Sequence, residues 1–156
     1  MNRNFDFLSL LRKKPQAFAS VMGSPDFPDI KGRVLFYQIN AGVVVMAQVW
    51  GLPKDKNILA FHIHSGSSCT GNKDDYFADA MTHYNPDKEP HPYHAGDMPP
   101  LFNADGVAYS LFLTNRFLVK DIIERTVIIH SSPDDFTTQP SGNSGTKIAC
   151  GVIKKW

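Results

Sequence analysis

Residues 31–50 read K-G-R-V-L-F-Y-Q-I-N-A-G-V-V-V-M-A-Q-V-W, and this stretch is the clearest structural signal in the chain. β-branched and aromatic residues fill both of its arms, and such residues favour the extended backbone of a strand. Asn40, Ala41 and Gly42 lie between the arms, and Asn and Gly tolerate the positive φ of a tight turn. The stretch therefore predicts a β-hairpin.

Downstream of the hairpin, the strand-like composition returns four times, over residues 58–64, 106–113, 125–131 and 146–153. Turn residues separate these stretches, and only residues 117–124 suggest a single turn of helix. Several short strands with turns between them are typical of an antiparallel sandwich or barrel. The sequence therefore predicts an all-β fold.

The chain has 156 residues and contains no internal repeat or low-complexity linker that would divide it. This length is sufficient for one hydrophobic core. We predict a single domain over residues 1–156, in which residues 1–15 form an atypical or poorly ordered N-terminal extension.

Composition narrows the choice of partner and compartment. Sixteen Lys and Arg residues against fifteen Asp and Glu residues give a net charge of +1, so charge does not indicate a nucleic-acid or membrane partner. The apolar run near the N-terminus is interrupted by Asp6 and precedes its basic residues, which is the wrong order for a secretory signal. We expect a cytoplasmic protein, or an extracytoplasmic one whose leader has been removed.

Residues 65–104 are rich in Gly, Ser, Asn, Asp and Pro and lack regular periodicity. A loop of this length inside one domain needs something other than secondary structure to order it. The segment contains Cys69 and three of the six histidines, so a metal and a cross-link are candidates. The only other cysteine is Cys150, and no C-x-x-C motif is present. Two free thiols or one long-range disulfide remain, and composition alone favours free thiols.

The histidines occur at spacings that suit metal coordination. His62 and His64 alternate within the strand predicted over residues 58–64, and side chains at positions i and i+2 of a strand point to the same face. His130 ends the apolar run V-I-I-H. The alternative is a set of independent surface or core histidines. Imidazole nitrogen suits copper, zinc, iron and nickel, so these residues do not identify the metal.

A second set of candidate ligands follows in the long loop. His91, His94 and Asp97 form an H-x-x-H-x-x-D pattern, and His83 precedes them. Three imidazoles and one carboxylate would complete the closed four-coordinate shell of a structural zinc ion. The alternative is a turn-rich surface loop that contains histidine by chance.

Six blocks of sequence, taken in order, resemble the copper,zinc superoxide dismutase family. They are F-H-I-H, Cys69, T-H-Y-N-P, H-A-G-D, R-T-V-I-I-H-S-S-P-D-D and G-N-S-G-T-K-I-A-C-G-V-I, and they run from about residue 60 to the end. The hairpin looks like the early strands of the family. The resemblance implies an eight-stranded antiparallel Greek-key sandwich or barrel with long metal-binding loops.

Carried over to this chain, the resemblance implies a site with two metals. Copper would be bound by His62, His64, His83 and His130, and zinc by His83, His91, His94 and Asp97, so that His83 bridges both ions. Asp134 would link one copper histidine to one zinc histidine by hydrogen bonds, and Cys69 and Cys150 would form a disulfide. The implied activity is dismutation of superoxide to O₂ and H₂O₂, with His83 delivering a proton.

Three features depart from the family pattern. Lys147 stands where an arginine usually guides the anion, and a lysine keeps the charge but loses the planar two-pronged donor. The loop between Asp135 and Gly145 has no lysine or glutamate, which predicts weaker steering of the substrate. The segment between Thr70 and Thr82 is longer than usual. The alternative function is therefore a non-catalytic relative that binds zinc or copper. A homodimer is one expected assembly, but the sequence does not decide between a monomer and a dimer. Trp156 at the C-terminus is either an interface residue or part of a frayed end, so it does not decide the question either.

Overall fold

The computed structural model describes residues 9–10 and 12–156, so the extension predicted over residues 1–15 lies largely outside the described residues. The described strands are β1 Ala17–Gly23, β2 Lys31–Ile39, β3 Gly42–Trp50, β4 Ile58–Leu59, β5 Phe61–His64, β6 Leu101–Phe102, β7 Val107–Thr114, β8 Thr126–His130 and β9 Lys147–Lys155. The short helices are η1 Ala78–Ala80 and α2 Val119–Ile122.

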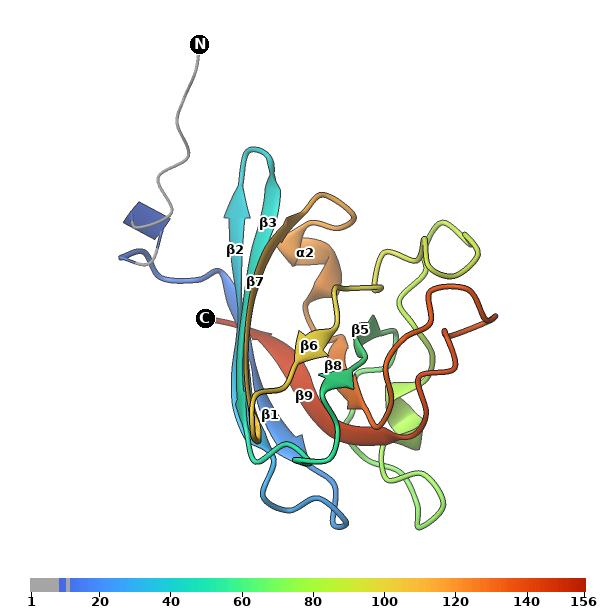
Figure 1. The fold of residues 1–156 in the computed structure, drawn as a ribbon. Coiled ribbons are helices and arrows are strands. Elements are labelled where there is room, and N and C mark those ends of the chain that lie inside the picture. The colour runs from blue at the N-terminus through green and yellow to red at the C-terminus, as the bar shows by residue number, and fades with distance from the viewer. Residues whose placement is uncertain (1–8, 11) are drawn as a thin grey trace.

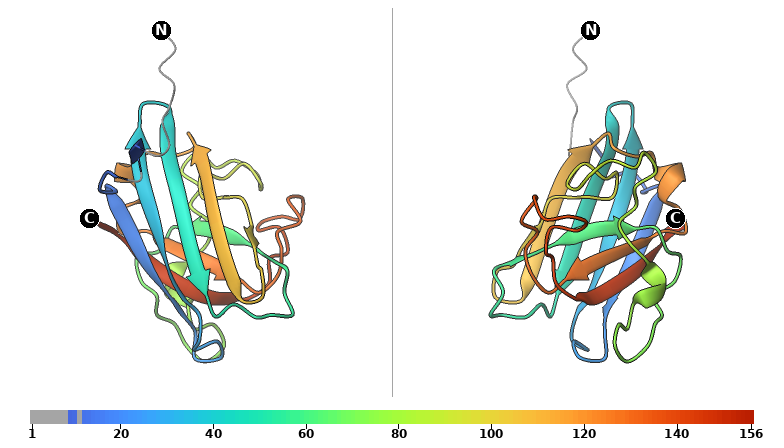
Figure 2. Two further views of the ribbon diagram at one scale, coloured as in Figure 1. Left: turned by 60° about the vertical axis from the view of Figure 1, so that its left-hand side comes forward. Right: turned by 90° about the vertical axis from the view of Figure 1, so that its right-hand side faces the viewer.

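Seven strands form one antiparallel sheet in the order β5-β8-β9-β1-β2-β3-β7, and β4 pairs with β6 in a second sheet. The large sheet curls, so that β1, β2, β3 and β7 form one layer and β5, β8 and β9 form the other (Figures 1 and 2). The chain leaves β3 for β5 at the opposite edge and later returns to β7 beside β3, which is a Greek-key connection. The predicted Greek-key sandwich is confirmed. The single strand expected over residues 58–64 is divided at Ala60 into β4 and β5.

The predicted hairpin is present as β2 and β3, which pair from Lys31 opposite Trp50 to Ile39 opposite Gly42. Its inward side chains meet those of β5 and β8 in one core, which includes the fully buried residues Phe36, Val45, Phe61, Ile63, Val127 and Ile129. Burying one such side chain contributes roughly 1.5–3 kcal/mol. This core therefore fixes the two strands, β5 and β8, that carry three of the histidines.

Two long loops lie together beyond β5 and β8 (Figures 1 and 2). One spans residues 65–100 and the other residues 131–146. A disulfide between Cys69 and Cys150 fastens the first loop to β9, so the disulfide implied by the family resemblance is confirmed and the free thiols favoured by composition are wrong. Arg125 also holds this loop, because Nη1 donates a hydrogen bond to Ser65 O at 2.6 Å and the guanidinium lies 4.7 Å from the Tyr84 ring centroid.

The helices of the described residues are minor elements. The turn of helix expected over residues 117–124 is present as α2, which has four residues. None of the described helices is long and apolar enough to cross a membrane.

Candidate metal centre

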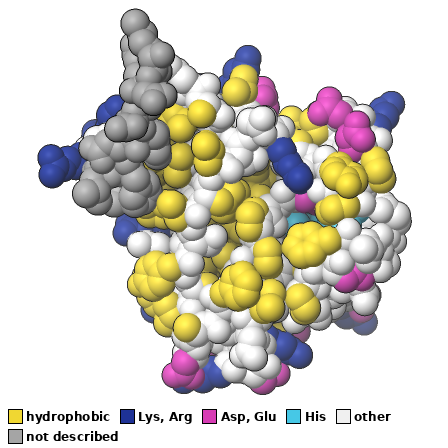
Figure 3. Space-filling model, turned by 45° about the horizontal axis from the view of Figure 1, so that its top comes forward, with side chains coloured by type: hydrophobic (Ala, Val, Ile, Leu, Met, Phe, Trp, Pro, Cys, Tyr) yellow, Lys and Arg dark blue, Asp and Glu magenta, His cyan; other side chains and the backbone are white. Residues whose placement is uncertain are grey.

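All six histidines and Asp97 gather in one buried region between the sheet and the two long loops, and each of them is at most 8 % exposed. On the face shown in Figure 3, histidine is visible only as a small area between neighbouring side chains. Their donor atoms form two groups, and within each group all of the donor atoms lie within 4.8 Å of one another. The first group is His62, His64, His83 and His130, and the second is His83, His91, His94 and Asp97.

Strand geometry builds the first group. His62 and His64 alternate with the core residues Phe61 and Ile63 on β5, so both imidazoles point away from the hydrophobic core toward the loops. His130 ends β8, the strand paired with β5, and a β-bulge at Ile129 and His130 shifts the register with β9. The expectation that alternation would bring these histidines to one place agrees with this geometry.

The hydrogen bonds of His64 and His130 indicate which of their nitrogens remain free. Nδ1 of His64 lies 2.9 Å from Met81 O, and Nδ1 of His130 lies 3.4 Å from Gly145 O. A carbonyl only accepts, so each Nδ1 carries the proton and each Nε2 presents a lone pair. The two Nε2 atoms face each other at 3.2 Å.

Burial keeps these imidazoles uncharged. It lowers the pKa of His64 well below its usual value and lowers the pKa of His130 to about 3. Two more nitrogens of the group, His62 Nδ1 and His83 Nε2, are buried without a hydrogen-bond partner among the described residues. Four inward lone pairs on imidazole nitrogens repel one another and are satisfied together by a metal cation, so the donor set fits copper.

The second group surrounds the carboxylate of Asp97. Its oxygens lie 2.7 Å from His83 Nδ1, 3.1 Å from His91 Nδ1 and 3.3 Å from His94 Nδ1. His91 Nδ1 makes no hydrogen bond with any described residue despite this distance, so its lone pair also faces the centre of the group. Three imidazole nitrogens and one carboxylate are a donor set that fits four-coordinate zinc.

His83 is the residue that the two groups share. Its Nδ1 faces Asp97 in the second group, and its Nε2 is one of the two buried nitrogens of the first group that have no hydrogen-bond partner among the described residues. One imidazole therefore offers a nitrogen to each side.

Asp134 connects the two groups through hydrogen bonds to one histidine of each. Its Oδ2 accepts a hydrogen bond from His62 Nε2 and its Oδ1 accepts one from His91 Nε2, both at 2.8 Å. Burial alone would raise the pKa of Asp134, but hydrogen bonds from His62, His91 and the Phe136 N–H outweigh it and lower the pKa to about 2. Because Asp134 fixes both Nε2–H groups, the Nδ1 atoms of these histidines remain free for metal.

Close approach of the second loop makes this arrangement possible. Gly142 has a φ of +67°, and a Cβ at this position would collide with the Asp134 carboxylate and with His91 Nε2. Glycine is therefore required here both by its backbone conformation and by space.

We expect Asp134→Asn to lower the affinity for both metals by about 10- to 100-fold, the usual cost of losing such a partner. An amide can accept from one imidazole N–H, but it presents its NH₂ to the other and leaves that ring misoriented. Chelator competition titrations of zinc and copper measure the effect. Asp135→Asn is the control, since Asp135 is exposed and, within the described residues, its side chain accepts hydrogen bonds from Thr137 and Thr138 alone. Equal affinities for both variants would contradict the role of Asp134.

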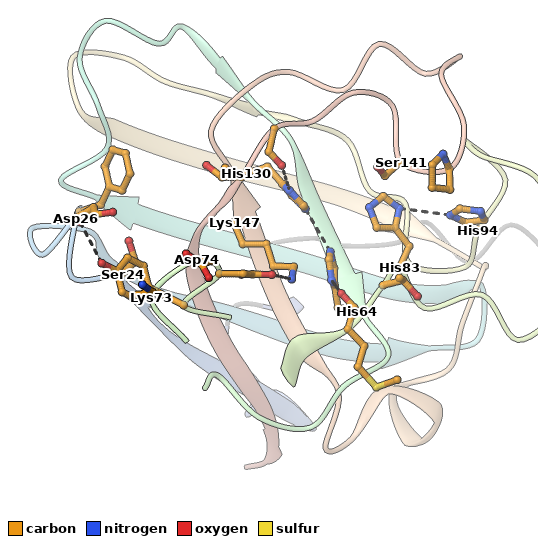
Figure 4. A pocket seen from close by; sticks show the side chains of 18 of the residues that line it. Ser24, Asp26, His64, Lys73, Asp74, His83, His94, His130, Ser141 and Lys147 are labelled. Atoms are coloured by element: carbon orange, nitrogen blue, oxygen red, sulfur yellow. Dashed lines mark hydrogen bonds and ion pairs between the residues drawn. The ribbon is translucent and has the colours of Figure 1, made fainter. Parts of the chain in front are cut away.

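A cleft of about 660 Å³ leads from the surface to the first group. His64, His83 and His130 line its inner end, and Lys73 and Lys147 line it together with Asp26, Asp74 and Asp75 (Figure 4). Lys147 therefore lies in the same cleft as the candidate copper ligands, as the family resemblance implies. Its Nζ is bound to Asp75 Oδ2 at 2.6 Å and to Phe77 O at 3.1 Å.

Two residues of the site were missed by the sequence analysis. Arg116 Nη1 donates to the carbonyl oxygens of Pro92 at 2.9 Å and of His94 and Asp97 at 3.3 Å, which holds the loop of the second group. Asp75 is the ion-pair partner of Lys147. No sequence signal identifies Arg116, because its contacts are with backbone atoms and carry no side-chain pattern. Asp75 lies in the segment between Thr70 and Thr82, and the expected length of that segment was the one sequence signal that pointed to it.

Comparison with known proteins identifies the family. Residues 30–153 match the family model described as copper/zinc superoxide dismutase (SODC). The chain belongs to the copper/zinc superoxide dismutase family. This membership confirms the resemblance that was based on the six sequence blocks.

Relatives of this superoxide dismutase family member come from bacteria and animals. "Superoxide dismutase [Cu-Zn] 2" of Aquifex aeolicus is 33% identical over 141 residues, which cover 81% of this chain and 80% of that protein. An extracellular superoxide dismutase [Cu-Zn] of Drosophila melanogaster is 35% identical over 161 residues, covering 88% and 84% respectively. The solved Cu/Zn superoxide dismutase from Brucella abortus superposes with a TM-score of 0.76 at 25% identity and covers 88% of this chain and 99% of that chain.

The metal-free form of this family member should lose stability in acid. Burial lowers the pKa of four histidines, namely His62, His64, His94 and His130. As the pH falls below 6.5, the unfolded chain takes up protons on these residues while the folded chain does not, until the pH reaches the lowered values (about 3 for His130). The free energy of unfolding should therefore fall by about 1.4 kcal/mol per pH unit for each histidine that stays neutral.

Asp134 adds a second decline at lower pH, because its stabilising contribution is present above pH 3.8 and is lost as the pH falls through about 2. Urea denaturation of the metal-free protein from pH 8.5 to 4 measures the histidine effect. The range from pH 7.5 to 8.5 serves as the control, since these histidines do not titrate there. A flat profile from pH 6.5 to 4 would contradict the prediction.

Proposed function

We propose that this chain catalyses the dismutation of superoxide to O₂ and H₂O₂ with one copper and one zinc ion. His62 Nδ1, His64 Nε2, His83 Nε2 and His130 Nε2 would hold the copper. His83 Nδ1, His91 Nδ1, His94 Nδ1 and Asp97 would hold the zinc. The observation that carries the proposal is His83, which is shared by two complete and buried donor groups.

Copper held there would supply a one-electron redox couple, oxidising one superoxide and reducing a second one, while zinc would be structural. The protein itself supplies a path for superoxide to the first donor group and a proton for the product. His83 lines the cleft, and its Nε2 is one of the buried nitrogens without a hydrogen-bond partner among the described residues. We assign to this atom, when it is not bound to copper, one of the two protons that the leaving peroxide requires. Asp97, 2.7 Å from Nδ1, fixes the orientation of the His83 ring.

We assign to Lys147 the role of guiding the anion. Its side chain lines the cleft together with His64 and His130, and it is the cationic residue of the cleft that is carried by the sheet itself, at the start of β9. A lysine offers a point charge rather than a flat pair of donors, so we expect attraction of the anion without two-pronged binding.

The alternative of a metal-binding relative without turnover is weakened by the first donor group. A protein that needed only structural zinc would have no requirement for a second group of four imidazoles at the end of a cleft. The deciding experiment compares superoxide dismutation by protein loaded with copper and zinc against protein loaded with zinc alone. A fast rate that depends on copper supports the enzyme. A rate no higher than that of free copper, with both metals bound, would leave the non-catalytic relative.

We also propose that the chain forms a homodimer. Along β7, three exposed apolar side chains, Tyr109, Leu111 and Leu113, alternate with buried or half-buried residues, and a row of this kind is a feature that an interface would cover. Sedimentation equilibrium should give about twice the chain mass of 17.4 kDa. The variant Leu111→Lys should shift the mass toward the monomer. A monomeric mass for the unmodified protein at micromolar concentration would contradict the proposal.

A further inference from the structure

The cleft carries more negative than positive side chains, and one of its two cations is already paired. Lys73 and Lys147 stand against Asp26, Asp74 and Asp75. Lys147 Nζ lies 2.6 Å from Asp75 Oδ2, with the lysine side chain 15% and the aspartate side chain 40% exposed. In Figure 4 the ammonium of Lys147 extends into the cleft, where the dashed line marks this ion pair. An anion that enters the cleft therefore meets a lysine whose charge is partly neutralised.

Hydrogen bonds and the disulfide hold both residues of the ion pair in place. Asp75 Oδ1 accepts a hydrogen bond from the Phe77 N–H at 3.0 Å, and Asn72 Oδ1 accepts from the N–H groups of Asp74 and Asp75 at 2.8 and 3.2 Å. The disulfide joins Cys69, just before this segment, to Cys150 on the strand that begins with Lys147. Phe77 O also accepts from Lys147. Asp75 is therefore fixed beside Lys147, unlike most exposed carboxylates, which are free to move away.

We propose that Asp75 is a built-in counter-ion, which competes with small anions for Lys147 and lowers the affinity of the cleft for them. The inference rests on the proposed function and adds a regulating residue to that same site. The segment 70–82 of the first long loop supplies this carboxylate. Removing its charge while keeping its shape should release Lys147 to bind an incoming anion.

Asp74 provides a matched control. It is the neighbouring residue, lines the same cleft and carries the same charge. The described ion pairs and hydrogen bonds of Lys147 include Asp75 but not Asp74. Asp74→Asn therefore changes the net charge of the cleft as much as Asp75→Asn does, while leaving the ion pair in place.

The test uses azide as the anion and protein loaded with copper and zinc, and it follows the visible absorption of copper. Asp75→Asn should bind azide about three- to fivefold more tightly than the unmodified protein, in keeping with the strength of a partly exposed ion pair. Asp74→Asn should stay within about 1.5-fold of the unmodified protein. In a Lys147→Gln background, Asp75→Asn should have no further effect. Asp75→Ser, which keeps an oxygen to accept from the Phe77 N–H, is the second variant should Asp75→Asn fold poorly.

Unchanged or weaker azide binding by Asp75→Asn and Asp75→Ser would overturn the inference, as would an equal gain in Asp74→Asn. Absence of a copper absorption band would defeat the proposed function, and the inference with it. A normal copper band with the expected azide shifts but no dismutation would defeat only the proposed function, whereas a fast dismutase with unshifted azide affinity would defeat only the inference.

Discussion

Replacing His83 by alanine should lower superoxide dismutation by about 10²- to 10⁴-fold, the range expected when a positioned proton donor is lost. His83 is the residue that belongs to both donor groups, with Nδ1 directed at Asp97 and Nε2 at the first group. Its removal takes one ligand from each proposed metal and also the atom assigned to deliver the proton. No other histidine of the site combines these positions.

His94→Ala is the matched control for this prediction. His94 belongs only to the second group, and it supplies no donor atom to the first. Its loss should weaken zinc binding while the copper donor set remains complete, so activity should fall much less than in His83→Ala. Stopped-flow measurement of superoxide decay, with the metal content of each variant determined in parallel, distinguishes the two. Equal losses would show that His83 acts only as a zinc ligand.

Much of the fold could be predicted because strand periodicity is a local property of sequence. The arms of the hairpin and the alternation of His62 and His64 with Phe61 and Ile63 depend only on neighbouring residues. The break at Ala60 was not predictable in this way, because Ala60 bonds residues far away in the chain, accepting from His130 N and donating to Ser132 O.

The two ligand groups were also accessible from sequence, since metal ligands must be particular residue types at particular spacings. The supporting contacts were not. Arg116 holds the second loop through three carbonyl oxygens, and any residue type would present the same carbonyls. Composition gave the wrong state for the cysteines for a similar reason: 81 positions of sequence separate two Cα atoms that the fold brings to 5.6 Å.

That disulfide carries the other large prediction. Replacing Cys69 and Cys150 together by serine should lower the free energy of unfolding by about 4 kcal/mol. The cross-link closes a loop with a sequence separation of 81 residues, and the chain-entropy relation gives roughly 3 kcal/mol for a loop of ~15 residues and ~4.7 for ~100. Cys150 is itself buried and packs with Phe77, Ala80 and Ile128, so a serine there also places a hydroxyl in an apolar cluster.

Urea denaturation of the metal-free protein at pH 7.5 measures this loss without a contribution from bound metal. Adding a thiol reductant to the unmodified protein should reproduce most of it, whereas the double variant should not respond to the reductant. The same cross-link anchors the segment that places Asp75 beside Lys147, so the double variant should also show weakened coupling between these two residues in the azide titration. A loss below about 1 kcal/mol would mean that the two long loops are held mainly by their hydrogen bonds and the core, and that the disulfide contributes little to the fold.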